Sequence, residues 1–193
     1  MKLLLRSALY VLVTTVFFGG LYPLAVTLAA RAIWPDRANG SYVSRDGRAV
    51  GSSLLGQRFQ RPEYLHSRPS AAGTNGYDAL ASGGRNLGPT DAKLARSIAE
   101  AVRQSRLYRP DRRPVPPDLV TASASGLDPH LSPDAAYWQA PRIAAARGVP
   151  EELVVELIRR HVEPRTLGIL GEPRVNVLLT NLDLDRSLHR ANR

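Results

Sequence analysis

The chain has 193 residues, 44% of them hydrophobic, with a net charge of +9 and no cysteine. This length supports one domain with its own core but would crowd two, and the lack of cysteine excludes disulfides, thiolate metal sites and cysteine nucleophiles. No run of Lys or Arg exceeds two residues, so the chain lacks the basic stripe with interleaved aromatics that is typical of nucleic-acid-binding proteins.

The amino-terminal region contains a long segment without charge, Ser7 to Ala30. At about 1.5 Å per residue, a helix of this length crosses the roughly 30 Å hydrocarbon core of a bilayer. A cleaved signal peptide is the alternative, but its apolar core normally spans only about 7–15 residues. We therefore predict a retained transmembrane anchor over residues 1–33 and one soluble domain over residues 34–193.

Small residues recur four apart in this segment, Thr15 with Gly19 and Ala25 with Ala29. This spacing allows another helix to approach closely. Together with the glycines, Pro23 predicts a kinked or closely packed helix rather than a broken one. One helix cannot form a transport pathway, so any transport role requires partner subunits.

Lys2 and Arg6 precede the segment, and short cationic flanks tend to stay in the cytoplasm. Arg31 weakens this asymmetry, although its long side chain can reach the opposite interface. The prediction is a single-pass membrane protein, with a cytoplasmic amino terminus and the domain on the outer side.

The next elements follow from local signals. Residues 41–44 and 48–51 flank Asp46-Gly47 and predict a hairpin. Residues 52–90 show no regular period and predict a structured loop region. Thr90 is the predicted cap of a helix from Asp91 to Tyr108, with Leu94, Ala95, Ile98 and Val102 on one core face.

The carboxyl-terminal part predicts further helices and a strand. Prolines over residues 109–117 prevent the preceding helix from continuing, and residues 118–130 are predicted to form a loop. One helix is predicted from Ser132-Pro133 to Gly148, with a break or kink at Pro141. A second helix is predicted to begin at Pro150 and to end before Pro164. Residues 174–180 predict a strand, and the tail after Asp185 is predicted to fray. The fold class is α+β: one transmembrane helix, then a compact, loop-rich extracytoplasmic domain with a few short strands and about three helices.

A glycine-rich loop is the first candidate for chemistry. Glycines that precede a helix can bring backbone N–H groups close to phosphate. The sequence loosely resembles the Ser-Gly-Gly-Gln loop of transport ATPases, with arginine in place of glutamine, and the alternative interpretation is a simple turn. The candidate nucleotide contacts are Ser82, Gly83, Gly84, Arg85 and Asn86.

A serine nucleophile is a weaker candidate. Ser123 and Ser125 lie near Asp128 and His130 in the sequence, but sequence neighbours need not converge and no nucleophile-elbow pattern is present. A hydrogen-bonded structural loop is the favoured interpretation. We predict no metal site, because the spacing typical of metal ligands is missing from the four histidines, His66, His130, His161 and His189.

Five stretches together resemble one family: GSSLLGQRF at 51–59, SRPSAA at 67–72, SGGRNLGPT at 82–90, DLVTASASGLDPHLSP at 118–133 and GEPRVNVLLTNLDLD at 171–185. The family is that of the KdpC subunits of the bacterial Kdp potassium-transporting P-type ATPase, and the resemblance covers essentially the entire chain. The sequence departs from the usual family pattern at Arg85, Ala124, Thr180 and Asp183.

The resemblance implies a non-catalytic accessory subunit of a complex in the bacterial inner membrane. In that complex a channel-like subunit selects potassium and a P-type ATPase subunit hydrolyses ATP. The family resemblance also implies a catalytic-chaperone role that raises the ATP affinity of the catalytic subunit. A domain on the outer side cannot touch cytoplasmic ATP, so we expect such an effect to be indirect and assign no bound cofactor to this chain.

Overall fold

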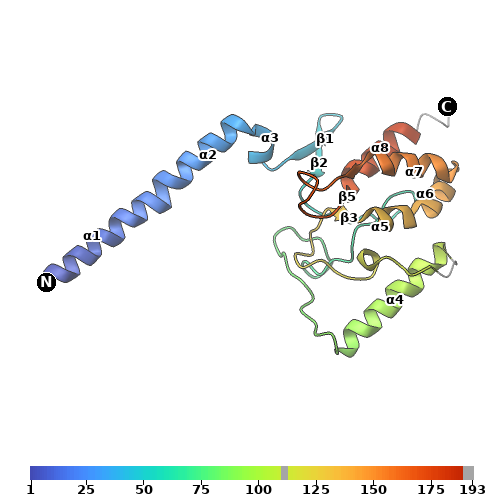
Figure 1. Cartoon of the computed structure of the whole chain (residues 1–193), viewed down its shortest axis with the longest axis horizontal. Helices are drawn as coiled ribbons and strands as arrows, with labels where there is room; N and C mark the ends of the chain where they lie inside the picture. Colours follow the sequence, from blue (N-terminus) through green and yellow to red (C-terminus); the bar gives the residue numbers. More distant parts are fainter. Residues whose placement is uncertain (110–112, 189–193) are drawn as a thin grey trace. The chain divides into compact units, whose positions relative to one another are not determined.

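The computed structural model describes residues 1–109 and 113–188 (Figure 1). The chain divides into two compact units, Met1–Ser52 and Ser53–Arg193. The predicted boundary between residues 33 and 34 stays a prediction.

The first unit begins with a continuous helix, Lys2–Ile33, which is apolar and long enough to cross a membrane once. It consists of α1 (Lys2–Val16), the π-helical segment η1 (Phe17–Leu21) and α2 (Tyr22–Ile33). Pro23 lies in the first turn of α2 and has no N–H, so the wider π turn before it accommodates the missing hydrogen bond. The helix extends past the predicted span at both ends, because flanking Lys and Arg residues are good helix formers.

The remainder of this unit is a short helix and a hairpin. Helix α3 covers Pro35–Ala38, and strand β1 (Tyr42–Arg45) pairs antiparallel with β2 (Arg48–Ser52). Asp46 and Gly47 have φ angles of +51° and +77°, the conformation that a tight hairpin turn requires. The predicted hairpin is confirmed.

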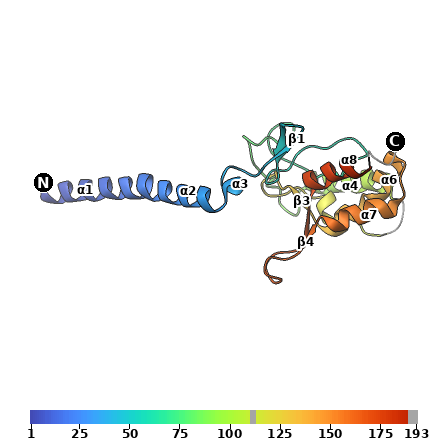
Figure 2. The same ribbon diagram turned by 90° about the horizontal axis from the view of Figure 1, so that it is seen from above.

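The second unit packs helices against a small sheet and long loops (Figures 1 and 2). Strand β5 lies between β3 and β4, antiparallel to both. Buried side chains of α5 to α8, of the strands β3 and β5 and of Leu65 form the core, and residues 53–91 contain no helix or strand. The α+β fold class is confirmed. Its elements are α4 (Ala92–Tyr108), the 3-10 turn η2 (Pro117–Leu119), β3 (His130–Leu131), α5 (Pro133–Trp138), α6 (Ala140–Arg147), α7 (Glu151–Arg160), β4 (Val162–Glu163), β5 (Arg174–Asn176) and α8 (Val177–Leu188).

Several predicted helix ends are confirmed. Ser132 caps α5 by accepting a hydrogen bond from the Ala135 N–H at 3.3 Å. Pro141 lies in the first turn of α6, where it separates α6 from α5, and Gly148 ends α6 with a φ of +66°. The predicted cap at Thr90 is wrong. Asp91 caps α4, because its carboxylate accepts the Lys93 N–H at 2.6 Å.

The predicted strand over residues 174–180 is wrong beyond Asn176. The Asn176 side chain accepts the Leu179 N–H at 3.1 Å and thereby starts α8. Helix α8 is buried on most of its surface, so its apolar residues do not follow the one-sided period by which a helix is recognised. The helix continues past Asp185 to Leu188, and the rest of the predicted tail, with His189, lies outside the described residues, as do residues 110–112 of the proline-rich break.

Candidate functional site

Loop segments that are far apart in the sequence converge in the second unit. We call residues 67–84 and 121–130 the loop cluster. Ser70 Oγ donates to the Gly126 carbonyl at 2.6 Å and accepts the Tyr77 N–H at 2.7 Å. A Cβ atom on Gly126 would lie 2.7 Å from both Ala72 N and Gly83 O. The backbones therefore pack too closely for any side chain at this position.

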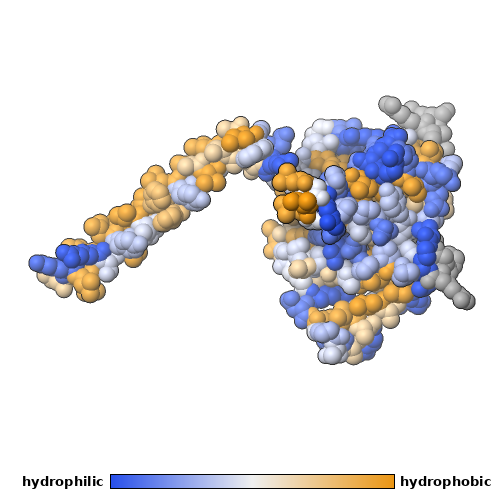
Figure 3. Space-filling view, in the orientation of Figure 1, coloured by the Kyte–Doolittle hydropathy of each residue, from blue (hydrophilic) through white to orange (hydrophobic). Residues whose placement is uncertain are grey.

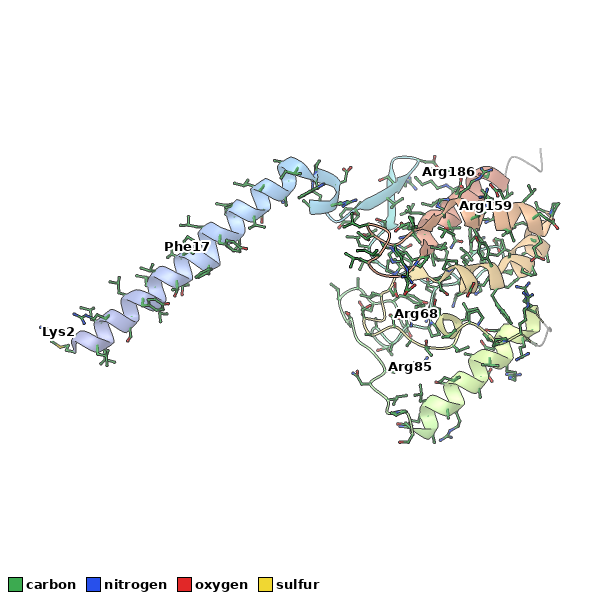
Figure 4. The ribbon with its side chains drawn as sticks, viewed as in Figure 1. Lys2, Phe17, Arg68, Arg85, Arg159 and Arg186 are labelled. Carbon is green, nitrogen blue, oxygen red and sulfur yellow. The ribbon has the colours of Figure 1, made fainter. Side chains whose placement is uncertain are left out.

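Arg68, which is labelled in Figure 4, lies between two acidic residues of this region. Its Nη1 lies 3.3 Å from Asp128 Oδ2 and 3.9 Å from Asp118 Oδ1. Burial acts to raise the pKa of Asp128, but hydrogen bonds from His130 and the charge of Arg68 keep that pKa below its usual value. Asp128 is therefore ionised at neutral pH, in a charge pair that fixes the loops.

The predicted nucleotide contacts lie at the edge of the loop cluster. Ser82 Oγ and the Gly83 N–H both donate to the Ser125 carbonyl, at 3.0 and 2.9 Å. A Cβ atom on Gly84 would lie 2.8 Å from the Ala124 carbonyl oxygen. Arg85 points to α4, where its Nη1 lies 2.8 Å from Ser97 Oγ (Figure 4).

This geometry differs from a phosphate loop in two respects. The Gly83 N–H already has a backbone acceptor, and α4 begins only at Ala92, well after Asn86. A phosphate loop instead presents free N–H groups at the start of a helix. A nucleotide role for Ser82 to Asn86 stays a prediction.

The candidate serines do not form a nucleophile-base pair. Ser123 is buried, and Ser125 Oγ accepts the Leu127 N–H at 3.1 Å. His130 instead faces Asp128, with 3.6 Å between Nδ1 and Oδ1. Within the described ranges, no hydrogen bond joins either serine to His130, and no three His, Asp or Glu side chains lie close enough to hold a metal ion.

A cleft of about 770 Å³ separates α4 from the core helices. Arg85, Arg103 and Arg142 line it together with one carboxylate, that of Glu100, so its lining is cationic. The apolar residues of α4 that were predicted to form a core face are at most half-buried, because the cleft lies where a packed interface would be. Sequence reasoning missed Arg103 and Arg142, since nothing local connects two helices that lie far apart in the chain.

Buried amides hold one wall of this cleft. Gln139 accepts the His66 N–H at 2.9 Å and donates to the His66 carbonyl at 3.1 Å. Asn181 makes the same two contacts with Leu65, at 2.7 and 3.0 Å. Arg142 donates to the carbonyls of residues 62 and 64 at 2.6 and 3.0 Å. These side chains bond to the backbone N–H and carbonyl groups of residues 62–66, as an adjacent β-strand would.

The same arrangement shifts the pKa of His66. Burial lowers the pKa of the imidazole, and the nearby charge of Arg142 lowers that pKa further. His66 Nε2 lies 3.2 Å from Arg142 Nη1. The same nitrogen lies 3.0 Å from the Arg61 carbonyl oxygen, and this contact raises the pKa of His66 but does not offset the two lowering effects.

Comparison with known proteins shows which family the chain resembles. A family model described as "K+-transporting ATPase, c chain" matches residues 4–186. A protein of Myxococcus xanthus named "Potassium-transporting ATPase KdpC subunit" is 58% identical over 176 residues, which cover 90% of this chain and 83% of that protein. One of the same name from Nitratidesulfovibrio vulgaris is 53% identical over 187 residues, which cover 96% and 95% of the two chains.

Proposed function

The chain belongs to the family of c chains of the K+-transporting ATPase, and from this premise we propose that it is a non-catalytic accessory subunit. Its helix packs on the channel-like subunit of the complex. Its domain, residues 34–193, lies on the outer side, stabilises the assembly with the ATP-hydrolysing subunit and covers the potassium entrance. Any effect on ATP affinity then passes indirectly through the complex.

The observation that carries this proposal is the uncovered amino-terminal helix. None of the residues in α1, η1 and α2 is buried within the chain. A Cβ atom on Gly20 would meet nothing within 4 Å, and one on Gly19 would meet only the Thr15 methyl group at 3.9 Å. A helix with open space around its glycines fits close packing against another membrane helix.

The loop cluster supports a structural rather than catalytic role. Ser70 Oγ bonds to the Gly126 backbone, and the Arg68 guanidinium pairs with Asp128. The sequence also lacks the Asp-Lys-Thr-Gly motif that a P-type ATPase phosphorylates. Both features fit a scaffold that holds partner subunits.

The test is to purify the ATPase complex from cells that lack this subunit. We expect incomplete assembly and a lower apparent affinity for potassium, and both should return when the full-length chain is expressed from a plasmid. Normal assembly together with normal potassium affinity in its absence would sink the proposal.

Direct nucleotide binding is the second candidate, and the cationic cleft favours it because Arg85 lines that cleft. Photolabelling of the intact complex with a reactive ATP analogue tests it. If this chain binds nucleotide, Arg85→Ala should remove its label, whereas the control Arg96→Ala on the exposed face of α4 should not. Label on the catalytic subunit alone would count against this candidate.

A membrane-anchored serine hydrolase is the least supported alternative. Ser125 is exposed, but its hydroxyl accepts a backbone N–H and makes no hydrogen bond to His130 among the described residues. We expect no reaction of the purified chain with a serine-directed phosphonate probe. Labelling that disappears in Ser125→Ala would revive the hydrolase.

A further inference from the structure

A hairpin that joins β4 to β5 carries large aliphatic side chains at its tip. Residues 164–172, here called the arm, are exposed along their entire length. Leu167, Ile169 and Leu170 are 85%, 74% and 57% exposed. Figure 2 shows the arm projecting from its unit, and Figure 3 shows a hydrophobic patch where Figure 1 places the chain between β4 and β5.

Local bonds hold the arm in this form. Thr166 and Leu170 exchange two backbone hydrogen bonds of 2.9 and 3.0 Å, and Arg165 Nη2 lies 2.6 Å from Glu172 Oε2. Leu167 has a φ of +54°, a left-handed conformation that a residue with a Cβ rarely adopts. The arm therefore keeps its apolar tip away from the core, although burial there would be favourable.

We infer that the arm docks into an apolar hollow on a neighbouring subunit of the potassium-transporting ATPase. The inference rests on the proposed function, because it takes the other subunits of the complex as the neighbours. It adds to that function the surface through which the outer domain makes contact.

The charges at the base of the arm favour a protein partner over lipid. Besides the Arg165–Glu172 pair, Arg174 Nε lies 2.9 Å from Glu163 Oε2, so the four charges cancel. Segments that rest on a bilayer surface typically carry Trp or Tyr with an excess of Lys and Arg. The arm has neither, whereas a neutral aliphatic tip is complementary to an apolar hollow in a protein.

The small area of the apolar tip indicates that the partner lies in the same membrane. Three side chains cover far less than the roughly 800 Å² per partner that a stable complex of freely diffusing proteins requires. The arm alone therefore cannot hold a soluble partner or a second copy of this chain. A subunit in the same membrane is different, because the helix Lys2–Ile33 keeps both at high effective concentration.

Photocrosslinking tests the partner directly. The full-length chain, with benzoylphenylalanine in place of Ile169, is expressed with the rest of the complex and irradiated in cells. We expect a crosslink to another subunit of the ATPase. Leu80 is the matched control, since it is 99% exposed in the same unit but lies outside the arm. No crosslink from position 169, or crosslinks only to lipid or to a second copy, would overturn the inference.

Substitution tests its contribution to assembly. We expect Ile169→Asp to lower the amount of this subunit in the detergent-purified complex about tenfold, and Leu80→Asp to leave it unchanged. An unaltered thermal unfolding midpoint of the Ile169→Asp chain shows that folding is intact. If Ile169→Asp assembles normally while deletion of the subunit disrupts the complex, the docking inference fails and the proposed function stands. If deletion also has no effect, the proposed function fails as well.

Discussion

Single buried polar side chains carry much of the order in this loop-rich domain, and Asn181 is the clearest case. It is 2% exposed and satisfies both backbone groups of the buried Leu65. Asn181→Leu leaves that N–H and carbonyl without partners and also adds volume at a buried site, so we expect the free energy of unfolding to fall by about 2–5 kcal/mol. Urea unfolding followed by circular dichroism measures this change.

The control for Asn181 is Asn75→Leu, at an exposed position of the same unit. We expect that control to change the free energy of unfolding by no more than about 0.5 kcal/mol. An equally small effect of Asn181→Leu would contradict the role of the amide as a clamp.

His66 should make stability depend on pH. Because its pKa is lower in the folded chain than in the unfolded chain, the unfolded state takes up the proton first as pH falls. The stabilising contribution is therefore complete above about pH 6.5 and is lost as pH falls through the folded pKa. Unfolding at pH 8 and pH 5 should show a smaller difference for His66→Gln than for the unsubstituted chain. Identical pH dependence of the two would refute this assignment.

The helices and strands whose ends are marked by capping or turn-forming residues were predictable from the sequence. The hairpin follows from Asp46-Gly47, and α5 and α6 from Ser132, Pro141 and Gly148. Helix α8 was not, because burial on most sides removes the period that reveals a helix, and because Asn176 acts as a cap only in its folded setting. Propensity read from neighbouring residues cannot include either effect.

The candidate site was less predictable than the helices for a related reason. The sequence identified the glycine-rich loop containing Arg85, but the cleft that this residue lines also needs Arg103 from α4 and Arg142 from α6. Such contacts depend on tertiary packing, and no spacing along the chain encodes them.

The membrane helix offers a test of packing. A Cβ atom on Gly19 would meet only the Thr15 methyl group, at 3.9 Å, so Gly19→Leu fits within this helix but holds a neighbouring helix away. We expect the amount of this subunit that copurifies with the other subunits of the ATPase to fall several-fold. Val26→Leu, which enlarges an exposed residue of the same helix, is the control. Equal copurification of both variants would show that Gly19 does not face a partner.

The side of the membrane on which the domain lies determines whether it can contact ATP directly. Because the chain has no cysteine, Asn75→Cys gives a single thiol at an exposed site. We expect a membrane-impermeant maleimide to label it in intact cells whose outer membrane is permeable, and to label Lys2→Cys only after lysis. The reverse pattern would place the domain in the cytoplasm and make direct contact with ATP credible. Arg112, a second site predicted to be accessible, lies outside the described residues.

The amide clamps also constrain when the domain can fold. Leu65 lies at the start of the second unit, and its partner Asn181 lies 116 residues later. A chain emerging from the ribosome exposes residues 53–66 long before the helices that hold them have been synthesised, and contacts of such large sequence separation form slowly. Folding of this unit therefore has to wait until α8 has been synthesised, and a polypeptide truncated before α8 would be a target for proteases.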